Sequence, residues 1–272
     1  MPVQFTILGS GSTGNCAYLE TAEVRLLIDA GFSGKQIRER LASIQRTPER
    51  LTGILLTHEH SDHTQGLKTI AVKHQIPVYC NRLTKEAIEK QVPNPMPFQV
   101  FATGSSFELG DVTVETFSIP HDAYDPVGFL IRTGAGNLGF LTDLGHATRM
   151  IVERVRQANV LVLEANYDRK LLQEDTRRPW STKQRIMSRH GHLSNDGAAE
   201  VADQIVTEQL RHIYLCHLSQ DCNDPAVAHR TVSERLLQSG ATHVTVETTT
   251  QKHPSPTLNL DEILLACPPT MP

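Results

Sequence analysis

One stretch of this chain, Thr57-His58-Glu59-His60-Ser61-Asp62-His63, places three imidazoles and an aspartate within six positions. It follows a short apolar run, Gly53-Ile54-Leu55-Leu56, which is typical of a buried strand. The stretch therefore predicts a tight loop at a strand end, where a rigid scaffold presents side chains to a cleft. Imidazole and carboxylate groups bind Zn²⁺ and similar divalent ions.

This density of ligands exceeds what one catalytic ion with an open coordination position needs. We therefore expect two metals that share the loop, an arrangement that stabilises both oxygens of a displacement reaction. The alternative is a polar surface loop that happens to be rich in histidine, but such a loop would gain nothing from this density.

The composition is that of a soluble globular protein. The chain has 272 residues, of which 39% are hydrophobic and 21% are charged, so disorder is excluded and one domain over residues 1–272 is expected. The tail after about residue 250 is rich in proline and threonine, which predicts weak structure there. The net charge of −4 argues against general adhesion to nucleic acid or anionic membranes, although a local basic patch remains possible.

The sequence favours the cytoplasm and no association with a membrane. The first residues have no basic segment followed by an apolar core, so no signal peptide is expected, and no stretch reaches membrane-spanning length. The five cysteines form no CxxC pair and are interpreted as reduced thiols; they are Cys16, Cys80, Cys216, Cys222 and Cys267. The oligomeric state stays open.

Strands and helices are expected to alternate in the first and last thirds of the chain, around a β-rich middle. Strands are predicted at 3–8, 23–28, 53–56, 78–80, 99–102, 107–109, 112–119, 127–132, 138–142, 160–164, 212–216 and 243–248. Helices are predicted near 33–44, 64–75, 83–91, 149–157, 195–209 and 224–238. This pattern predicts an α/β fold with two sheets and helices outside them, a four-layer arrangement.

Three more strands are followed by residues that can bind metals. His121, Asp143 and His217 each come directly or almost directly after an apolar run. One such residue would be weak evidence, because a buried histidine satisfied by hydrogen bonds is the commoner case. Three of them, added to the first loop, supply enough ligands for two ions.

The chain resembles the metallo-β-lactamase superfamily over nearly its whole length, with the motifs in the same order. Its HxHxDH motif is highly specific for that superfamily. The resemblance implies an αββα fold with the metals at the open edge between the sheets. It also implies the following sites: His58, His60 and His121 for one metal, Asp62, His63 and His217 for the other, Asp143 as the bridge, and Asp29 as a buried carboxylate that orients the metal loop. The ions would be Zn²⁺ or Mn²⁺, with Fe²⁺ possible.

Asp143 narrows the choice among the branches of this superfamily, because classical β-lactamases of this fold commonly have cysteine at the position. An aspartate resembles the phosphodiesterase and thioesterase branches. Leu161-Val162-Leu163-Glu164-Ala165-Asn166 and Gly191-His192-Leu193-Ser194-Asn195 resemble the ribonuclease Z pattern. That resemblance implies catalytic roles for His192 as general acid, for Glu164 as its orienting partner and for the metal ligand Asp62. The alternatives are that His192 only caps or packs the helix, or that His190 takes its role.

Substrate contacts are expected from two regions. The segment 169–189 is basic in an otherwise acidic protein, which fits contact with a phosphate backbone, and its tryptophan could stack on a base. The small-residue loop 9–15 could approach a phosphate through its backbone N–H groups. The candidates are Arg177, Arg178, Trp180, Lys183, Arg185, Ser10, Ser12, Asn15, Ser194 and Asn195. The alternatives are a solvated helix face and an ordinary turn.

Taken together, these motifs closely resemble the WalJ (YycJ) group of bacterial proteins in this superfamily. The resemblance implies a metal-dependent exonuclease that acts on DNA from 5′ ends, so the expected partner is nucleic acid, DNA more than RNA. Neither the long arm of ribonuclease Z nor the inserted domain of the β-CASP nucleases is evident. The alternatives are a thioester hydrolase resembling glyoxalase II, a small-molecule phosphodiesterase acting for example on cyclic nucleotides, and a metal-holding scaffold without catalysis.

Overall fold

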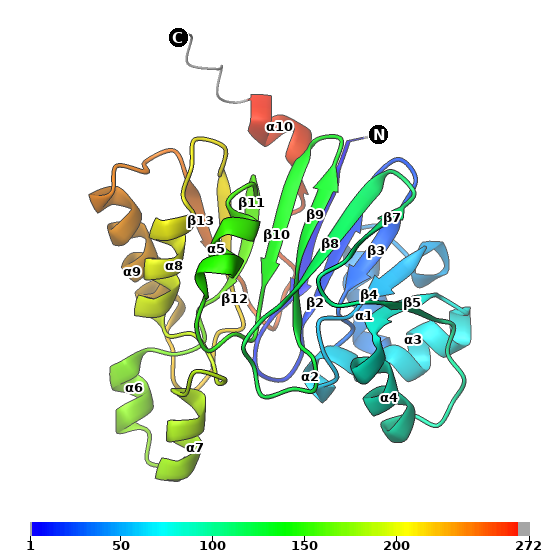
Figure 1. The fold of residues 1–272 in the computed structure, drawn as a ribbon, viewed down its shortest axis with the longest axis horizontal. Coiled ribbons are helices and arrows are strands. Elements are labelled where there is room, and N and C mark those ends of the chain that lie inside the picture. The colour runs from blue at the N-terminus through cyan, green and yellow to red at the C-terminus, as the bar shows by residue number, and fades with distance from the viewer. Residues whose placement is uncertain (1, 266–272) are drawn as a thin grey trace.

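Residues 2–265 are described by the computed structural model, and they form a sandwich of two β-sheets with helices on both outer faces (Figure 1). Within this range each sheet has seven strands. The first sheet has the order β14 (Leu258–Asn259), β1 (Gln4–Gly9), β2 (Cys16–Glu20), β3 (Arg25–Ile28), β4 (Gly53–Leu55), β5 (Val78–Asn81) and β6 (Phe98–Phe101). The second has the order β13 (Thr245–Thr248), β12 (His212–Cys216), β11 (Val160–Glu164), β10 (Gly136–Leu141), β9 (Val127–Thr133), β8 (Val112–Ser118) and β7 (Ser106–Leu109).

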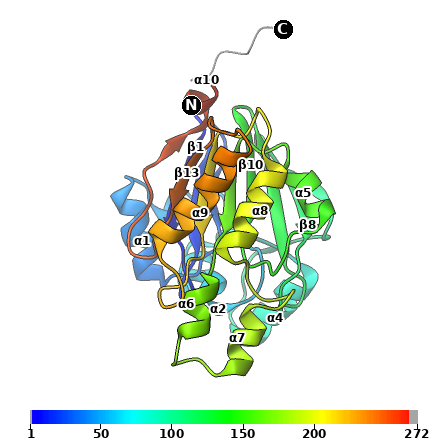
Figure 2. The same cartoon turned by 90° about the vertical axis from the view of Figure 1, so that its left-hand side faces the viewer.

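The helices cover the two outer faces, as Figures 1 and 2 show from two sides. The first sheet is covered by α1 (Gly34–Ser43), α3 (Leu67–His74) and α4 (Arg82–Gln91), and the second by α5 (Arg149–Val155), α8 (Asn195–Ile205) and α9 (Pro225–Gln238). The end of the sandwich away from the termini carries α2 (Ser61–Thr64), α6 (Arg169–Glu174) and α7 (Trp180–Ile186). The short helix η1 (Pro48–Arg50) and α10 (Leu260–Leu265) complete the described part.

Apolar residues fill three layers, one between the sheets and one under each set of helices. Along β3, Leu26 and Ile28 face the layer between the sheets, whereas Leu27 faces α1 and α3. Along β11, Val160 and Val162 do the same, and Leu161 packs beneath α5 and α8. Both faces of these strands are buried, so they appear in the sequence as continuous apolar runs. The predicted four-layer αββα fold is confirmed.

Strand direction brings the important strand ends to one edge of the sandwich. In the first sheet β3, β4 and β5 are parallel, and in the second sheet β10, β11 and β12 are parallel. β8 and β10 are both antiparallel to β9, so β8 also runs in the direction of β10. The residues that follow these strands therefore meet where α2, α6 and α7 lie, opposite the termini (Figure 1).

Several elements differ from the expectations. The strand β2 and the helices α6 and α7 were not predicted, and Ser61–Thr64, expected as a loop, forms the short helix α2. The tail expected to be weakly structured after about residue 250 instead adds β14 to the edge of the first sheet, paired with β1, and then α10. Residues 266–272 of that tail, including Cys267, lie outside the described part. None of the helices in residues 2–265 combines the length and apolarity that crossing a membrane requires.

Candidate metal centre and catalytic cavity

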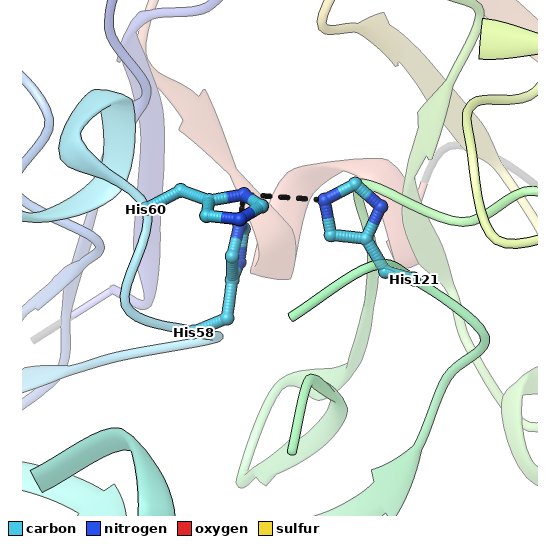
Figure 3. Close-up of side chains that lie close together, drawn as sticks. All are labelled: His58, His60 and His121. Carbon is cyan, nitrogen blue, oxygen red and sulfur yellow. Dashed lines mark hydrogen bonds between the residues drawn. The ribbon is translucent and has the colours of Figure 1, made fainter. Parts of the chain in front are cut away.

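Three imidazoles from two sheets converge at the edge of the sandwich (Figure 3). His58 and His60 follow β4, and His121 follows β8. Nδ1 of His60 lies 3.0 Å from Nε2 of His58 and 3.3 Å from Nε2 of His121. Each ring therefore directs one nitrogen toward the same small region, which is the arrangement that a metal ion bound by three histidines requires.

A second group of possible ligands lies beside the first, formed by Asp62, His63, Asp143 and His217. Nε2 of His63 is 3.1 Å from Oδ2 of Asp143 and 3.5 Å from Oδ2 of Asp62. Nε2 of His217 is 3.3 Å from that Asp62 oxygen and 3.4 Å from Oδ1 of Asp143. The same Oδ1 lies 3.8 Å from Nε2 of His121, so the Asp143 carboxylate stands between the two groups.

Hydrogen bonds on the outer sides of the rings fix which nitrogen faces the centre. Nδ1 of His121 donates to the carbonyl oxygen of Gly191 at 3.1 Å, and Nδ1 of His63 donates to Oδ2 of Asp29 at 2.7 Å. A carbonyl or carboxylate oxygen can only accept, so the Nε2 atoms of both rings are left to act as ligands. Outer partners of this kind orient metal-bound imidazoles in proteins.

Asp29 holds the metal loop, residues 57–63, in place through hydrogen bonds to its two ends. Its carboxylate is completely buried, and besides His63 it accepts the backbone N–H of Thr57 at 2.9 Å and the Thr57 hydroxyl at 2.9 Å. The residue stands at the end of β3, next to β4 in the same sheet. One carboxylate therefore contacts both the start of the loop and the ring of its last histidine.

Three residues at the centre have a left-handed backbone. Asp29, Asp143 and His217 have φ angles of 60°, 56° and 55°, a region that residues other than glycine seldom adopt. Each of them is the first residue or the second residue after a strand end. Such strain persists only where the surrounding structure enforces it, and it is concentrated at functional sites.

The electrostatics of the cluster favour bound cations. Burial alone would lower the pKa of His63, but the carboxylates of Asp143, Asp29 and Asp62 raise it well above its ordinary value. Burial would favour the neutral acid of Asp143, yet the imidazoles of His217 and His63 hold its pKa well below the usual range. Buried carboxylates at this density need positive charge beside them. The donor set of imidazoles and carboxylates therefore suits divalent metal ions.

His192 and Glu164 form a pair on one wall of the centre. Nδ1 of His192 lies 2.7 Å from Oε1 of Glu164, and Oε2 of Glu164 accepts the backbone N–H groups of Leu144 at 2.9 Å and Leu193 at 3.1 Å. Burial would lower the pKa of His192, but the Glu164 carboxylate raises it above its ordinary value. The Glu164 carboxylate therefore favours the protonated form of this imidazole.

A cavity of about 450 Å³ opens above both groups of ligands. Its lining includes ligands from each group (His60, His121, Asp62, Asp143 and His217) together with His192. The outer walls include Ser12, Asp122, Arg178 and Arg185, so α7 and the loop after β8 face each other across it. An ion pair between Arg185 and Asp122 joins these two walls.

The side chains of the basic segment 169–189 differ in whether they face the cavity. Arg178 and Arg185 line the cavity, whereas Arg177 lies outside the lining. Arg177 and Arg178 both pair with Asp175 and Asp221. Lys183 is buried, and its ammonium group donates to a backbone carbonyl of α6 at 2.7 Å, so it does not face the cavity. Trp180 is 58% exposed and also stands outside the lining.

The small polar residues expected to touch substrate are mostly engaged within the protein. Ser10 accepts the backbone N–H of His217 at 2.8 Å and donates to Asn15, whose amide lies 3.1 Å from Nε2 of His63. Ser194 caps α8, and Asn195 is buried against a neighbouring asparagine. Of this set only Ser12 lines the catalytic cavity. The others hold the metal ligands or the helix in place.

Sequence reasoning left Asn166 and Asp122 without a role. Asn166 donates to the carbonyl oxygen of His217 at 2.9 Å and lines the cavity, so it fixes the position of that ligand. Asp122 contacts Nε2 of His121 at 3.5 Å. Their proximity in sequence to Glu164 and His121 was the available signal, but the partner of Asn166 is 51 residues away and only the fold reveals it.

Comparisons with known proteins agree with this geometry. A family model described as a beta-lactamase superfamily domain matches residues 24–217. The chain is 38% identical over 243 residues to the exodeoxyribonuclease YycJ of Bacillus anthracis, which covers 88% of this chain and 91% of that protein. It is also 38% identical over 240 residues to the exodeoxyribonuclease WalJ of Streptococcus pneumoniae, covering 87% and 89%. Among solved structures, the metallo-beta-lactamase fold protein YhfI of Bacillus subtilis superposes with a TM-score of 0.70 at 15% identity, covering 94% of this chain and 99% of that one.

Proposed function

The chain belongs to the metallo-β-lactamase superfamily, and from this membership we propose that it is a metal-dependent nuclease that hydrolyses phosphodiester bonds in nucleic acid. One observation carries the proposal. The His192–Glu164 pair places a proton donor on the wall of the cavity that also contains both groups of metal ligands. A phosphodiester needs such a donor, because its leaving oxygen develops negative charge as the bond to phosphorus breaks.

Two divalent ions, Zn²⁺ or Mn²⁺ with Fe²⁺ also suitable, would activate water and neutralise charge on the phosphate when bound. His58, His60 and His121 would hold one ion. Asp62, His63 and His217 would hold the other, with Asp143 between the two. Asp29 keeps the loop in register with both sites through His63 and Thr57.

The residues of the chain then divide the remaining work. His192 donates its proton to the departing oxygen, and Glu164 keeps the imidazolium charged and in position. Oε2 of Glu164 is fixed by two backbone N–H groups, so the carboxylate can hold the ring at one orientation. Arg178 and Arg185 on the cavity wall provide positive charge for the flanking phosphates.

The preferred substrate in this proposal is DNA, attacked from 5′ ends. The two relatives named exodeoxyribonucleases, each matched over most of its length, support DNA and attack from an end. The 5′ polarity is what the resemblance to the WalJ group implies. We place the activity in the cytoplasm. The four cysteines within residues 2–265 are buried and unbridged, which suits a reducing compartment.

End-labelled single- and double-stranded DNA and RNA, incubated with the protein and either Zn²⁺ or Mn²⁺, test the proposal directly. We expect stepwise shortening of DNA from the 5′ end. His192→Ala should keep its metal content and lose about 10²- to 10⁴-fold in turnover, the contribution typical of a general acid. His190→Ala is the matched control, because this histidine is exposed two positions away and should leave the rate unchanged.

Three results would overturn the proposal. The first is metal-loaded protein that leaves every nucleic acid intact. The second is cleavage by His192→Ala at the normal rate, which would remove the proposed acid. The third is hydrolysis of a thioester such as an acylated glutathione without action on oligonucleotides, which would favour the thioesterase branch instead.

A further inference from the structure

A second cavity lies beside the catalytic one, on the side of the β1–β2 loop. Its volume is about 400 Å³, close to that of the catalytic cavity. Ser219 lines both cavities, so the two share part of a wall. The remaining wall is built by the loop between β12 and α9, which includes Gln220, by the start of α9 and by the loop that begins with Ser10. The segment after β13 completes it with Thr250, Gln251 and Lys252.

The chemistry of this second cavity differs from that of the first. The catalytic cavity is lined by three aspartates, Asp62, Asp122 and Asp143. None of the residues that line the second cavity is acidic, although acidic residues outnumber basic ones in the chain. The lining includes one basic residue, the exposed Lys252.

Several of the remaining polar groups already donate within the protein, among them the hydroxyls of Ser10 and Thr249 and the amide of Asn223. The hydroxyl of Ser219 and the second N–H of the Gln220 and Gln251 amides are left to donate to phosphate or sugar oxygens beside Lys252. The cavity therefore offers an anionic group one cation and a few hydrogen-bond donors.

The walls of the cavity are held in place by the protein itself. The backbone N–H of Ser10 donates to the carbonyl oxygen of Thr250 at 3.1 Å, and the Gln220 amide donates to Oε1 of Gln251 at 2.7 Å. Arg40 donates to the carbonyl oxygen of Gln251 at 2.7 Å. A site that is already ordered loses less conformational entropy when a ligand binds.

The cavity is also connected to the metal ligands. The Ser10 hydroxyl that accepts the backbone N–H of His217 belongs to a residue of the second cavity, and Ser219 is linked to Asn166 through a backbone hydrogen bond of 2.8 Å. Adjacent nucleotides of one strand are joined through a phosphodiester, so a strand bound at the metal ligands can extend into a cavity that shares part of its wall with the catalytic one.

We propose that this second cavity binds the nucleotide adjacent to the scissile phosphodiester, with Lys252 contacting its phosphate. The inference rests on the proposed nuclease function and deepens it by assigning a second subsite. The segment after β13 then contacts the substrate in addition to forming the wall of the cavity. A substrate without this neighbouring nucleotide should reach the metal centre but gain nothing from the second cavity.

The test compares wild type with Lys252→Gln and Gln220→Glu, using the full-length, metal-loaded protein. The substrates are bis(p-nitrophenyl) phosphate, which fits the catalytic cavity alone, a dinucleotide and a series of longer oligonucleotides. Lys90→Gln is the matched control, because this lysine is exposed on α4 and lines neither cavity. The KM, the kcat and the dependence of KM on salt concentration are measured for each.

For Lys252→Gln we expect an increase in KM of about tenfold on the longer oligonucleotides, with the slope of log KM against log salt reduced by about one. Gln220→Glu should raise KM in the same way, by placing a negative charge in the cavity. Hydrolysis of bis(p-nitrophenyl) phosphate and the kcat should be unchanged in both variants, and Lys90→Gln should match wild type.

The proposal falls if wild type cleaves oligonucleotides and both variants retain its KM and salt slope. It also falls if the variants lose activity equally on the chromogenic diester, since that result indicates damage to the metal centre. A wild-type protein that cleaves no oligonucleotide would overturn the nuclease function together with the subsite. These results are distinguishable, because the first two are obtained with a wild type that cleaves DNA.

Discussion

Replacing Asp29 by asparagine tests how the metal loop is held, because the change alters a single group of a completely buried side chain. The volume stays the same, and asparagine tolerates the left-handed backbone that this position has. Oδ1 can still accept the backbone N–H of Thr57. The new amide nitrogen then faces Nδ1–H of His63, where the carboxylate oxygen stood at 2.7 Å. Two donors now point at each other.

The magnitude follows from this geometry. A hydrogen bond to a charged group contributes about 1.5–3 kcal/mol, and about 1.4 kcal/mol corresponds to a factor of ten in affinity. We therefore expect the ion at Asp62, His63 and His217 to bind about 10- to 100-fold more weakly in Asp29→Asn. This range agrees with the general cost of removing an outer partner of a metal ligand. The ion at the three histidines should be little affected.

Metal titration against a competing chelator, with the bound ions counted by elemental analysis, measures the effect. We expect one ion to be lost from Asp29→Asn at chelator concentrations that leave both on wild type. Asp203→Asn is the control, because Asp203 lies on α8 and pairs with Arg235 away from the centre. Equal retention of both ions by Asp29→Asn and wild type would refute the role given to this carboxylate.

Four further predictions concern the catalytic cavity and the segment beside it. Glu164 raises the pKa of His192, so the acid form of His192 persists to higher pH, and activity falls as the pH rises through the His192 pKa. In Glu164→Gln this fall should begin at a lower pH in a kcat–pH profile. Lys183→Met should lower stability by about 1–3 kcal/mol in thermal melts, because it removes the hydrogen bond from the charged ammonium group to a carbonyl of α6, without raising the KM for DNA. Arg185→Gln should show the opposite pattern, a higher KM at unchanged stability, and equal effects of the two changes would contradict both assignments. Asp143→Ala should lose at least one ion by elemental analysis, and full metal content would contradict its place between the two sites.

The sequence predicted the strands and layers for a simple physical reason, because strands buried on both faces are continuous apolar runs. His121, Asp143 and His217 could therefore be recognised as residues that follow such runs. The placement of the ligands at one edge was implied by the family resemblance. The helix-period signal was equally clear for the long helices α8 and α9.

The roles of the small polar residues could not be predicted, because their partners are distant in the chain. Ser10 is separated by 207 residues from the backbone N–H that it accepts, and nothing near it in sequence indicates this contact. Lys183 looks like an exposed cation in a basic segment, yet its ammonium group turns inward to a carbonyl of α6. Hydrophobic periodicity also fails for β14, which is only two residues long.

The left-handed backbone of Asp29, Asp143 and His217 has a consequence for attempts to engineer this protein. An L-residue in that conformation costs roughly 1–2 kcal/mol, and glycine adopts it without that penalty. Glycine would relieve this strain but remove the buried contacts of each side chain, such as the three hydrogen bonds that Asp29 accepts, so a screen for heat resistance alone would weigh strain against contacts and not against catalysis. A screen for stable variants must also measure turnover, because at these positions the placement of the ligands requires a backbone conformation that is itself unfavourable.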